Sequence, residues 1–369
     1  MAQGKRNRVI DICKGVAIIL MVIGHCETPQ WLVSFLYLFH MPIFFMAAGY
    51  FFSRRSLADP WSFCIKRFKG LYIPFVKWSI FFLIIHNVLF KFNILNEMYG
   101  NWEGGVTHPY TWNQAFQRLV HIIFSMGGYD EFMAGAFWFF RALLVSSIVF
   151  LVLYYVLDNR CKWLRGNRVV AMIAVGALLF AWFKIANRLT IATVVQGGIR
   201  ETWGVFFFAA GVLFRRVENW ILKNWWVVFF CIAVLAIGTY NKWAGMNLSP
   251  KVQDVLTLPL TGVCGFTMTF LFASLLDRRD LVGKRFLSHC GQMSIYIYVF
   301  HIAAFKLASL VKIVYYGLPF EQIGSHMVIH EHLHDSFWIL YTVCGVGLPL
   351  LWMYCYRAVA NQRRVQQSR

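Results

Sequence analysis

The sequence predicts an all-α fold, a polytopic membrane helical bundle of about ten transmembrane helices with the N- and C-termini cytoplasmic. Three observations predict it. The 369 residues are 59% hydrophobic and only 14% charged, with a mean hydropathy of +0.57, whereas soluble domains carry about 25% charged residues. Apolar runs of spanning length recur along the chain. The lysines and arginines gather in alternate connections between these runs. We therefore expect a single membrane-embedded domain over residues 1–369.

Ten runs are long and apolar enough to be interpreted as spans. They cover residues 9–26, 31–52, 71–90, 133–157, 169–183, 202–214, 225–240, 255–276, 293–310 and 337–356. The sixth run is short and could begin earlier, around Ile191. The first run follows a basic start but no small-residue cleavage site, so we expect it to be retained. An even number of spans places both termini on one side of the membrane.

Basic residues decide which side that is. The formal net charge is +19, with 35 Lys and Arg against 16 Asp and Glu. The connections that share a side with the termini hold most of these cations, which the positive-inside rule assigns to the cytoplasm. Because the cations are spread over short connections rather than one patch, we expect the lipid bilayer and no nucleic acid as a partner. The nine cysteines show no paired spacing, so a disulfide framework is not expected.

The first run carries Asp11, Lys14 and His25 on one helical face. Lys14 and His25 are eleven residues apart, close to three turns, and Asp11 and His25 are fourteen apart, close to four. An ionisable side chain in a bilayer costs roughly 2.5 to 3.5 kcal/mol, so the three need partners or a wet cavity. Asp11 and Lys14 have the spacing of a helical ion pair. The charge asymmetry puts Lys14 near the cytoplasm and His25 near the outer face, and a structural polar stripe is the alternative.

Two histidines are candidate catalytic groups. His25 titrates near neutral pH and can act as a general base or nucleophile toward a hydroxyl, and Glu27 either orients it or is solvated. His40 lies in the second run as a candidate second catalytic group. Pro42 breaks a backbone hydrogen bond and Gly49 permits close helix approach, so this run should be kinked and tightly packed.

Further candidates follow in the chain. The cations after the second run either determine topology or bind the phosphates of an anionic donor; they are Arg54, Arg55, Lys66, Arg67 and Lys69. Trp138 fits core or acceptor packing, and Arg141 inside an apolar run needs a carboxylate such as Glu131, a cavity or an acceptor. His301 either lines the same pore or is a satisfied core histidine.

Several segments in order resemble the acyltransferase 3 family, membrane enzymes that O-acylate saccharides and other envelope components. The matching features are the Asp11, Lys14 and His25 spacing and the segments 39–52, 66–74, 135–140 and 291–301. Lys14 and Gly70 depart from the family, where arginine is frequent at both positions. Lysine lacks the bidentate fork of arginine but keeps the point charge.

The resemblance implies an O-acetyltransferase with no permanently bound cofactor. Acetyl-CoA would be the co-substrate on the cytoplasmic side, and the acceptor would be a hydroxyl of a saccharide or other envelope component. It further implies that His25 accepts the hydroxyl proton or briefly carries the acyl group, while Asp11 and Lys14 organise the donor end. We expect the protein in the bacterial cytoplasmic membrane.

Two other functions remain open. His330, Glu331 and His334 form the His-Glu-x-x-His pattern of zinc metallopeptidases, which requires a helix to align the two histidines. A cluster of four histidines readily produces this pattern by composition, and no third-ligand motif follows, so we expect no metal in the site. A transporter or proton-coupled carrier could instead use Asp11, Lys14, His25 and His40 as a path, although no internal repeat is visible.

Overall fold

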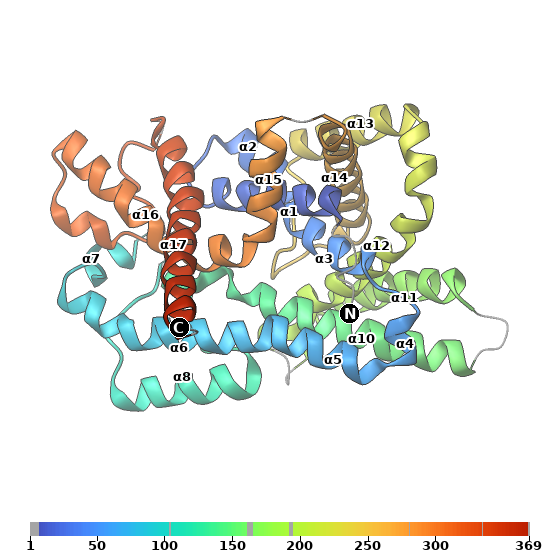
Figure 1. Cartoon of the computed structure of the whole chain (residues 1–369), viewed down its shortest axis with the longest axis horizontal. Helices are drawn as coiled ribbons and strands as arrows, with labels where there is room; N and C mark the ends of the chain where they lie inside the picture. The colour runs from blue at the N-terminus through green and yellow to red at the C-terminus, as the bar shows by residue number, and fades with distance from the viewer. Residues whose placement is uncertain are drawn as a thin grey trace.

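The computed structural model describes residues 7–102, 105–160, 165–191, 195–279, 281–333 and 335–367, and within these residues every regular element is helical (Figure 1). The α-helices are α1 (Arg8–Ile23), α2 (Gln30–Tyr37), α3 (His40–Tyr50), α4 (Arg55–Ala58), α5 (Pro60–Arg67), α6 (Ile73–Lys91), α7 (Glu97–Gly100), α8 (Trp112–Ser125), α9 (Glu131–Ala134), α10 (Trp138–Arg160), α11 (Asn167–Ala186), α12 (Ile199–Lys223), α13 (Trp226–Tyr240), α14 (Asp254–Asp277), α15 (Val282–Gln292), α16 (Ser294–Tyr316) and α17 (Phe337–Gln367). Short 3-10 or π turns are η1 (Phe68–Tyr72), η2 (Gly135–Phe137), η3 (Val195–Gly198) and η4 (Phe320–Gly324).

Each of the ten expected runs contains a helix. Among the described residues, seven helices are long and apolar enough to cross a membrane, and α12 with α13, which are bent by 112° relative to each other, can be counted as an eighth span. Helix α1 has 16 residues, fewer than the roughly 20 that span a hydrocarbon core. The all-α, multi-pass architecture is confirmed, whereas the count of ten and the cytoplasmic termini stay predictions.

The second run is interrupted, as expected, but not at Pro42. Helix α2 ends at Tyr37 and α3 begins at His40. Phe39 between them has a φ of −149°. Pro42 lies in the first turn of α3, where a backbone N–H has no partner within the helix, so the proline costs no hydrogen bond there. The break therefore places His40 at a helix start.

The basic segment 66–74 is helical rather than a loop. Helix α5 continues through the π turn η1 into α6 without an intervening coil. Pro74 has no N–H to offer the carbonyl of Gly70, and the wider turn η1 accommodates this missing bond. In Figure 1 the joined helix runs along the lower part of the molecule with α8 beside it.

Glycines bring the site-bearing helices into backbone contact with their neighbours. A Cβ on Gly15 of α1 would lie 1.9 Å from the carbonyl oxygen of Leu287 in α15. A Cβ on Gly49 of α3 would lie 1.9 Å from the carbonyl oxygen of Phe208 in α12. The expected close packing at Gly49 is thus confirmed. The polar helix α15 was not among the expected elements, and it packs along α1.

Candidate active site

Two cavities lie along α1 and share part of their walls. The first, of about 390 Å³, is called the histidine cavity, and its polar and aromatic lining comprises His25, Tyr37, His40, Tyr129, Glu131, Phe132, Trp138, Gln196, Arg200, Asn247 and His326. The second, of about 280 Å³, is called the lysine cavity and is lined by Lys14, Arg67, Ser294, Tyr298 and mostly apolar side chains. Met21 and Met41 line both. Helix α1 therefore contributes Lys14 to the lysine cavity, and the turn that follows Ile23 contributes His25 to the histidine cavity.

His25 is oriented by a second histidine behind it. Its Nδ1 lies 3.0 Å from Nε2 of His301, and the two rings stack with centroids 5.2 Å apart. Nδ1 of His301 faces the carbonyl oxygen of Tyr298 at 2.8 Å. A carbonyl only accepts, so His301 carries its proton on Nδ1 and accepts at Nε2. Nδ1 of His25 then donates, which leaves Nε2 of His25 as the basic nitrogen.

His40 reaches the same cavity from the break between α2 and α3. Its Nδ1 lies 2.8 Å from the carbonyl oxygen of Leu36 near the end of α2, which also accepts from the backbone N–H of Phe39. The same argument assigns the proton to Nδ1 and the lone pair to Nε2. Both histidines that the sequence singled out as catalytic candidates thus line one cavity, each with a carbonyl or histidine fixing its tautomer.

Arg141 does not line the histidine cavity. It is buried, and its Nε donates to Oε1 of Glu201 at 2.8 Å. Glu201, rather than Glu131, is therefore its carboxylate partner. The arginine that lines the cavity is Arg200, whose guanidinium lies 4.0 Å from the ring centroid of Trp138. Arg200 was not among the expected site residues, because no sequence motif marks it; it lies in the first turn of α12, which begins at Ile199.

Tyr129 and Glu131 add a donor and an acceptor to the cavity. Burial raises the pKa of Tyr129 to about 12, so its hydroxyl stays neutral and can donate near pH 7. Glu131 is exposed at the start of α9, where its carboxylate accepts hydrogen bonds. Together with Gln196 and Asn247 the cavity offers both hydrogen-bond donors and acceptors.

The expected ion pair at the other end of α1 is present. Nζ of Lys14 lies 2.9 Å from Oδ1 of Asp11, and the carboxylate of Asp11 is buried. Lys14 lines the lysine cavity with Arg67, whose guanidinium stacks on the rings of Phe63 and Phe208. One lysine and one arginine therefore give this cavity a positive wall.

The remaining candidate phosphate ligands lie outside the lysine cavity. Arg54, Arg55, Lys66 and Lys69 are all exposed. Arg54 instead borders a separate basic depression together with Arg165, Arg168 and Arg216. Of the five cations proposed after the second run, only Arg67 joins Lys14.

The histidine-rich segment before α17 is a folded loop. Residues 325–333 are not helical, because buried Lys306 donates to the carbonyls of Ile323 and Ser325, and buried Lys312 donates to those of Ile329 and His332. This loop delivers His326 to the histidine cavity. Burial lowers the pKa of His326 to about 4, so the ring is neutral near pH 7.

The helix that the metallopeptidase pattern needs is therefore missing from the described part of the segment. Nδ1 of His330 lies 3.5 Å from Oε1 of Glu27, and Glu331 accepts from the amide of Gln322. Glu27 thus pairs with His330 rather than orienting His25. His334 lies outside the described residues. No group of three or more potential metal ligands occurs among the residues that the structure describes.

Comparison with known proteins places this chain in a family. No curated protein and no solved structure matches it. The model of the acyltransferase 3 family, described as an acyltransferase domain, matches residues 7–358, nearly the whole chain. The resemblance seen in the separate segments is thereby confirmed. This multi-pass membrane protein belongs to the acyltransferase 3 family.

Proposed function

We propose that the protein is an O-acetyltransferase that moves an acetyl group from cytoplasmic acetyl-CoA to a hydroxyl of a saccharide or other envelope acceptor. The observation that carries the proposal is the chain of hydrogen bonds from the Tyr298 carbonyl through His301 to His25. It leaves a basic nitrogen on His25, in a cavity lined by groups that bind hydroxyls. A general base within reach of the hydroxyl is what attack on a thioester needs.

The reaction follows from this arrangement. Nε2 of His25 accepts the proton of the acceptor hydroxyl while the hydroxyl oxygen attacks the thioester carbonyl carbon. The carbon–sulfur bond then breaks, and the departing thiolate takes the proton from His25, giving the acetyl ester and free CoA. His301 stabilises the imidazolium that forms in between, since its Nε2 accepts from Nδ1 of His25.

The donor is held from the lysine cavity in this proposal. Lys14 and Arg67 supply the positive wall for the phosphate-bearing end of CoA. The thioester arm extends along α1 past Met21 and Met41 to His25. Lys14 and His25 are roughly 16 Å apart along the helix axis, so the donor binds in extended form.

A carrier is the second candidate, because two cavities that share a wall also suit a solute path. Inside-out membrane vesicles carrying the wild-type chain, given radiolabelled acetyl-CoA on the exposed cytoplasmic face, separate the two functions. Acetyl transfer predicts label covalently bound to the saccharide fraction, absent with His25→Ala and retained with His334→Ala at equal protein level. Uptake of label without covalent product, or unchanged transfer by His25→Ala, contradicts the proposal.

A further inference from the structure

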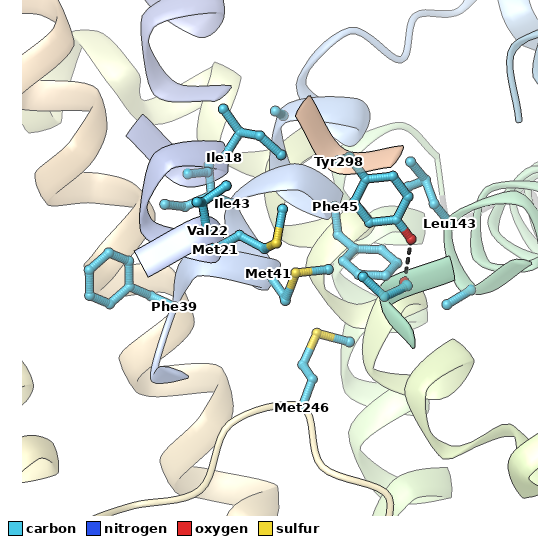
Figure 2. Close-up of a cluster of buried hydrophobic side chains, with 14 of the residues drawn as sticks. Ile18, Met21, Val22, Phe39, Met41, Ile43, Phe45, Leu143, Met246 and Tyr298 are labelled. Atoms are coloured by element: carbon cyan, nitrogen blue, oxygen red, sulfur yellow. Dashed lines mark hydrogen bonds between the residues drawn. The ribbon is translucent and has the colours of Figure 1, made fainter. Parts of the chain in front are cut away.

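The basic depression that Arg54 borders lies where two membrane-spanning helices end. Helices α10 and α11 are both long and apolar enough to cross a bilayer, and one ends at Arg160 and the other begins at Asn167. The depression has a volume of about 650 Å³, and among the described residues it shares none of its lining with the histidine or lysine cavity. Met21 and Met41, the wall common to those cavities, lie instead in the buried cluster of Figure 2. The depression is therefore a separate site.

Four arginines from separate segments line the depression. One follows α3, one precedes α11, one lies in the first turn of α11 and one lies in α12; they are Arg54, Arg165, Arg168 and Arg216. All four are exposed. In the part of the chain that the structure describes, no acidic side chain lines the depression and none of the four arginines forms an ion pair. The fold thus holds four like charges together, an arrangement that an anionic ligand would stabilise.

Local contacts hold Arg54 beside the start of α11. Arg54 donates to the hydroxyl of Tyr154, which in turn donates to the carbonyl of Gly166 at 3.4 Å. Gly166 has a φ of 63°, and a Cβ there would lie 3.3 Å from Nη2 of Arg54. The start of α11 has no side-chain cap and no acidic residue in its first turn, so its backbone N–H groups add to the positive potential of the arginines.

The rest of the lining and its surroundings favour a lipid as the carrier of the anion. Guanidinium groups bind phosphate oxygens in bidentate pairs. Beneath the arginines the depression has an apolar surface formed by Phe52, Leu57, Val170 and Val212. Exposed apolar side chains such as Val156 and Val175 continue along α10 and α11. A phospholipid matches both features, because its phosphate lies at the level where spans end and its acyl chains run along them, whereas a free phosphate compound would use the arginines alone.

From this arrangement we propose that the basic depression binds the phosphate of an anionic phospholipid headgroup, with its acyl chains along α10 and α11. Arg165, Arg168 and Arg216 contact the phosphate, and Arg54 is held beside them by Tyr154. Basic pockets between transmembrane helices are known to bind anionic headgroups in this way. The inference goes beyond acetyl transfer and does not depend on it, since the depression lies outside both cavities of the candidate active site.

Native mass spectrometry of the full chain in detergent tests the proposal, with phosphatidylglycerol as the anionic probe and phosphatidylcholine as the zwitterionic one. Wild type should bind phosphatidylglycerol more tightly. Arg168→Ala and Arg216→Ala should each weaken that binding by about fivefold, since one basic residue near an anionic lipid contributes roughly 1 kcal/mol. Arg168→Lys keeps the charge and should retain most of the affinity. Arg55→Ala is the matched control, because Arg55 is exposed and adjacent to Arg54 but does not line the depression.

Competition with CoA and with inorganic phosphate identifies the source of the phosphate. Failure of both to displace phosphatidylglycerol supports the lipid, whereas displacement by either assigns the depression to a free phosphate compound and overturns the proposal. Equal affinity for the two lipids, unchanged binding in both alanine variants, or an equal loss in Arg55→Ala also overturns it. If an alanine variant fails to accumulate, Arg168→Gln and Arg216→Gln remove the charge from a longer side chain and should show the same weakening. Because binding is measured without an acyl donor, a failure of the proposed acetyl transfer would leave this result unchanged.

Discussion

Nδ1 of His25 lies 3.0 Å from Nε2 of His301, although the two residues are separated by 276 positions in the chain. The carbonyl of Tyr298 determines the tautomer of His301, and His301 in turn determines that of His25. In the proposed reaction, this order of dependence gives His25 the role of general base and His301 a positioning role. The two roles predict different consequences of substitution.

His25→Ala should reduce acetyl transfer by roughly 10²- to 10⁴-fold, the usual contribution of a general base. His301→Leu should lower kcat less, and should leave KM for acetyl-CoA unchanged, because His301 does not line either cavity. His301→Gln, whose amide oxygen can accept from Nδ1 of His25, should recover part of that loss. Steady-state kinetics at matched protein level check this. Equal losses in His301→Leu and His301→Gln would contradict the positioning role.

The sequence predicted the parts of this site that rest on local spacing. The Asp11–Lys14 pair forms on α1 as its spacing requires. His25 was expected on the same helical face, but α1 ends at Ile23 and His25 lies in the turn after it. His301 as partner of His25 could not be predicted, because no local pattern records contacts between distant helices. The sequence alone could not show the conformation of the His-Glu-x-x-His segment for the same reason. Its histidines require a helix, and Lys306 and Lys312 instead hold the segment as a loop.

A second prediction from the sequence is that Arg141 binds the acceptor. In the structure it is paired with Glu201 and buried, so Arg141→Ala should destabilise the protein by about 3 to 5 kcal/mol by leaving a buried carboxylate unpaired. Arg141→Met combined with Glu201→Leu should restore most of that stability. Thermal unfolding of the detergent-solubilised protein measures both. Normal stability with a raised acceptor KM in Arg141→Ala would return Arg141 to the acceptor site.

Close packing of α3 on α12 predicts that Gly49→Ala destabilises the protein. Gly49→Ala places a methyl group 1.9 Å from a backbone oxygen, and overpacking of this kind costs about 1 to 3 kcal/mol or more. Gly176 in α11 is the matched control, because a Cβ there meets nothing within 4 Å. Gly176→Ala should stabilise the helix by about 0.5 to 1 kcal/mol. Melting temperatures of the two variants should therefore move in opposite directions.

Burial of His326 should make the stability of the folded protein depend on pH. Its pKa is about 4 in the folded protein, because of burial, and near 6.5 when unfolded. Between these values the unfolded chain binds more protons, so stability falls as pH falls from about 6.5 to 4 and is unaffected by this group above 6.5. His326→Gln removes that dependence. The difference in melting temperature between wild type and His326→Gln should change between pH 7.5 and pH 5, and a constant difference would contradict the assignment.

The cations that the sequence grouped as candidate phosphate ligands fall into two sets in the structure. Lys14 and Arg67 line the lysine cavity, whereas Lys66 and Lys69 are exposed outside it. Lys14→Ala and Arg67→Ala should raise KM for acetyl-CoA by about tenfold, equivalent to roughly 1.4 kcal/mol, through loss of a charge-assisted contact. Lys14→Arg should retain binding, since the positive charge is kept. Lys66→Ala and Lys69→Ala should change KM little at moderate salt, because exposed charges are screened. An equal rise in all four alanine variants would instead mean that donor phosphates bind the exposed helix surface, with the cavity admitting only the thioester arm.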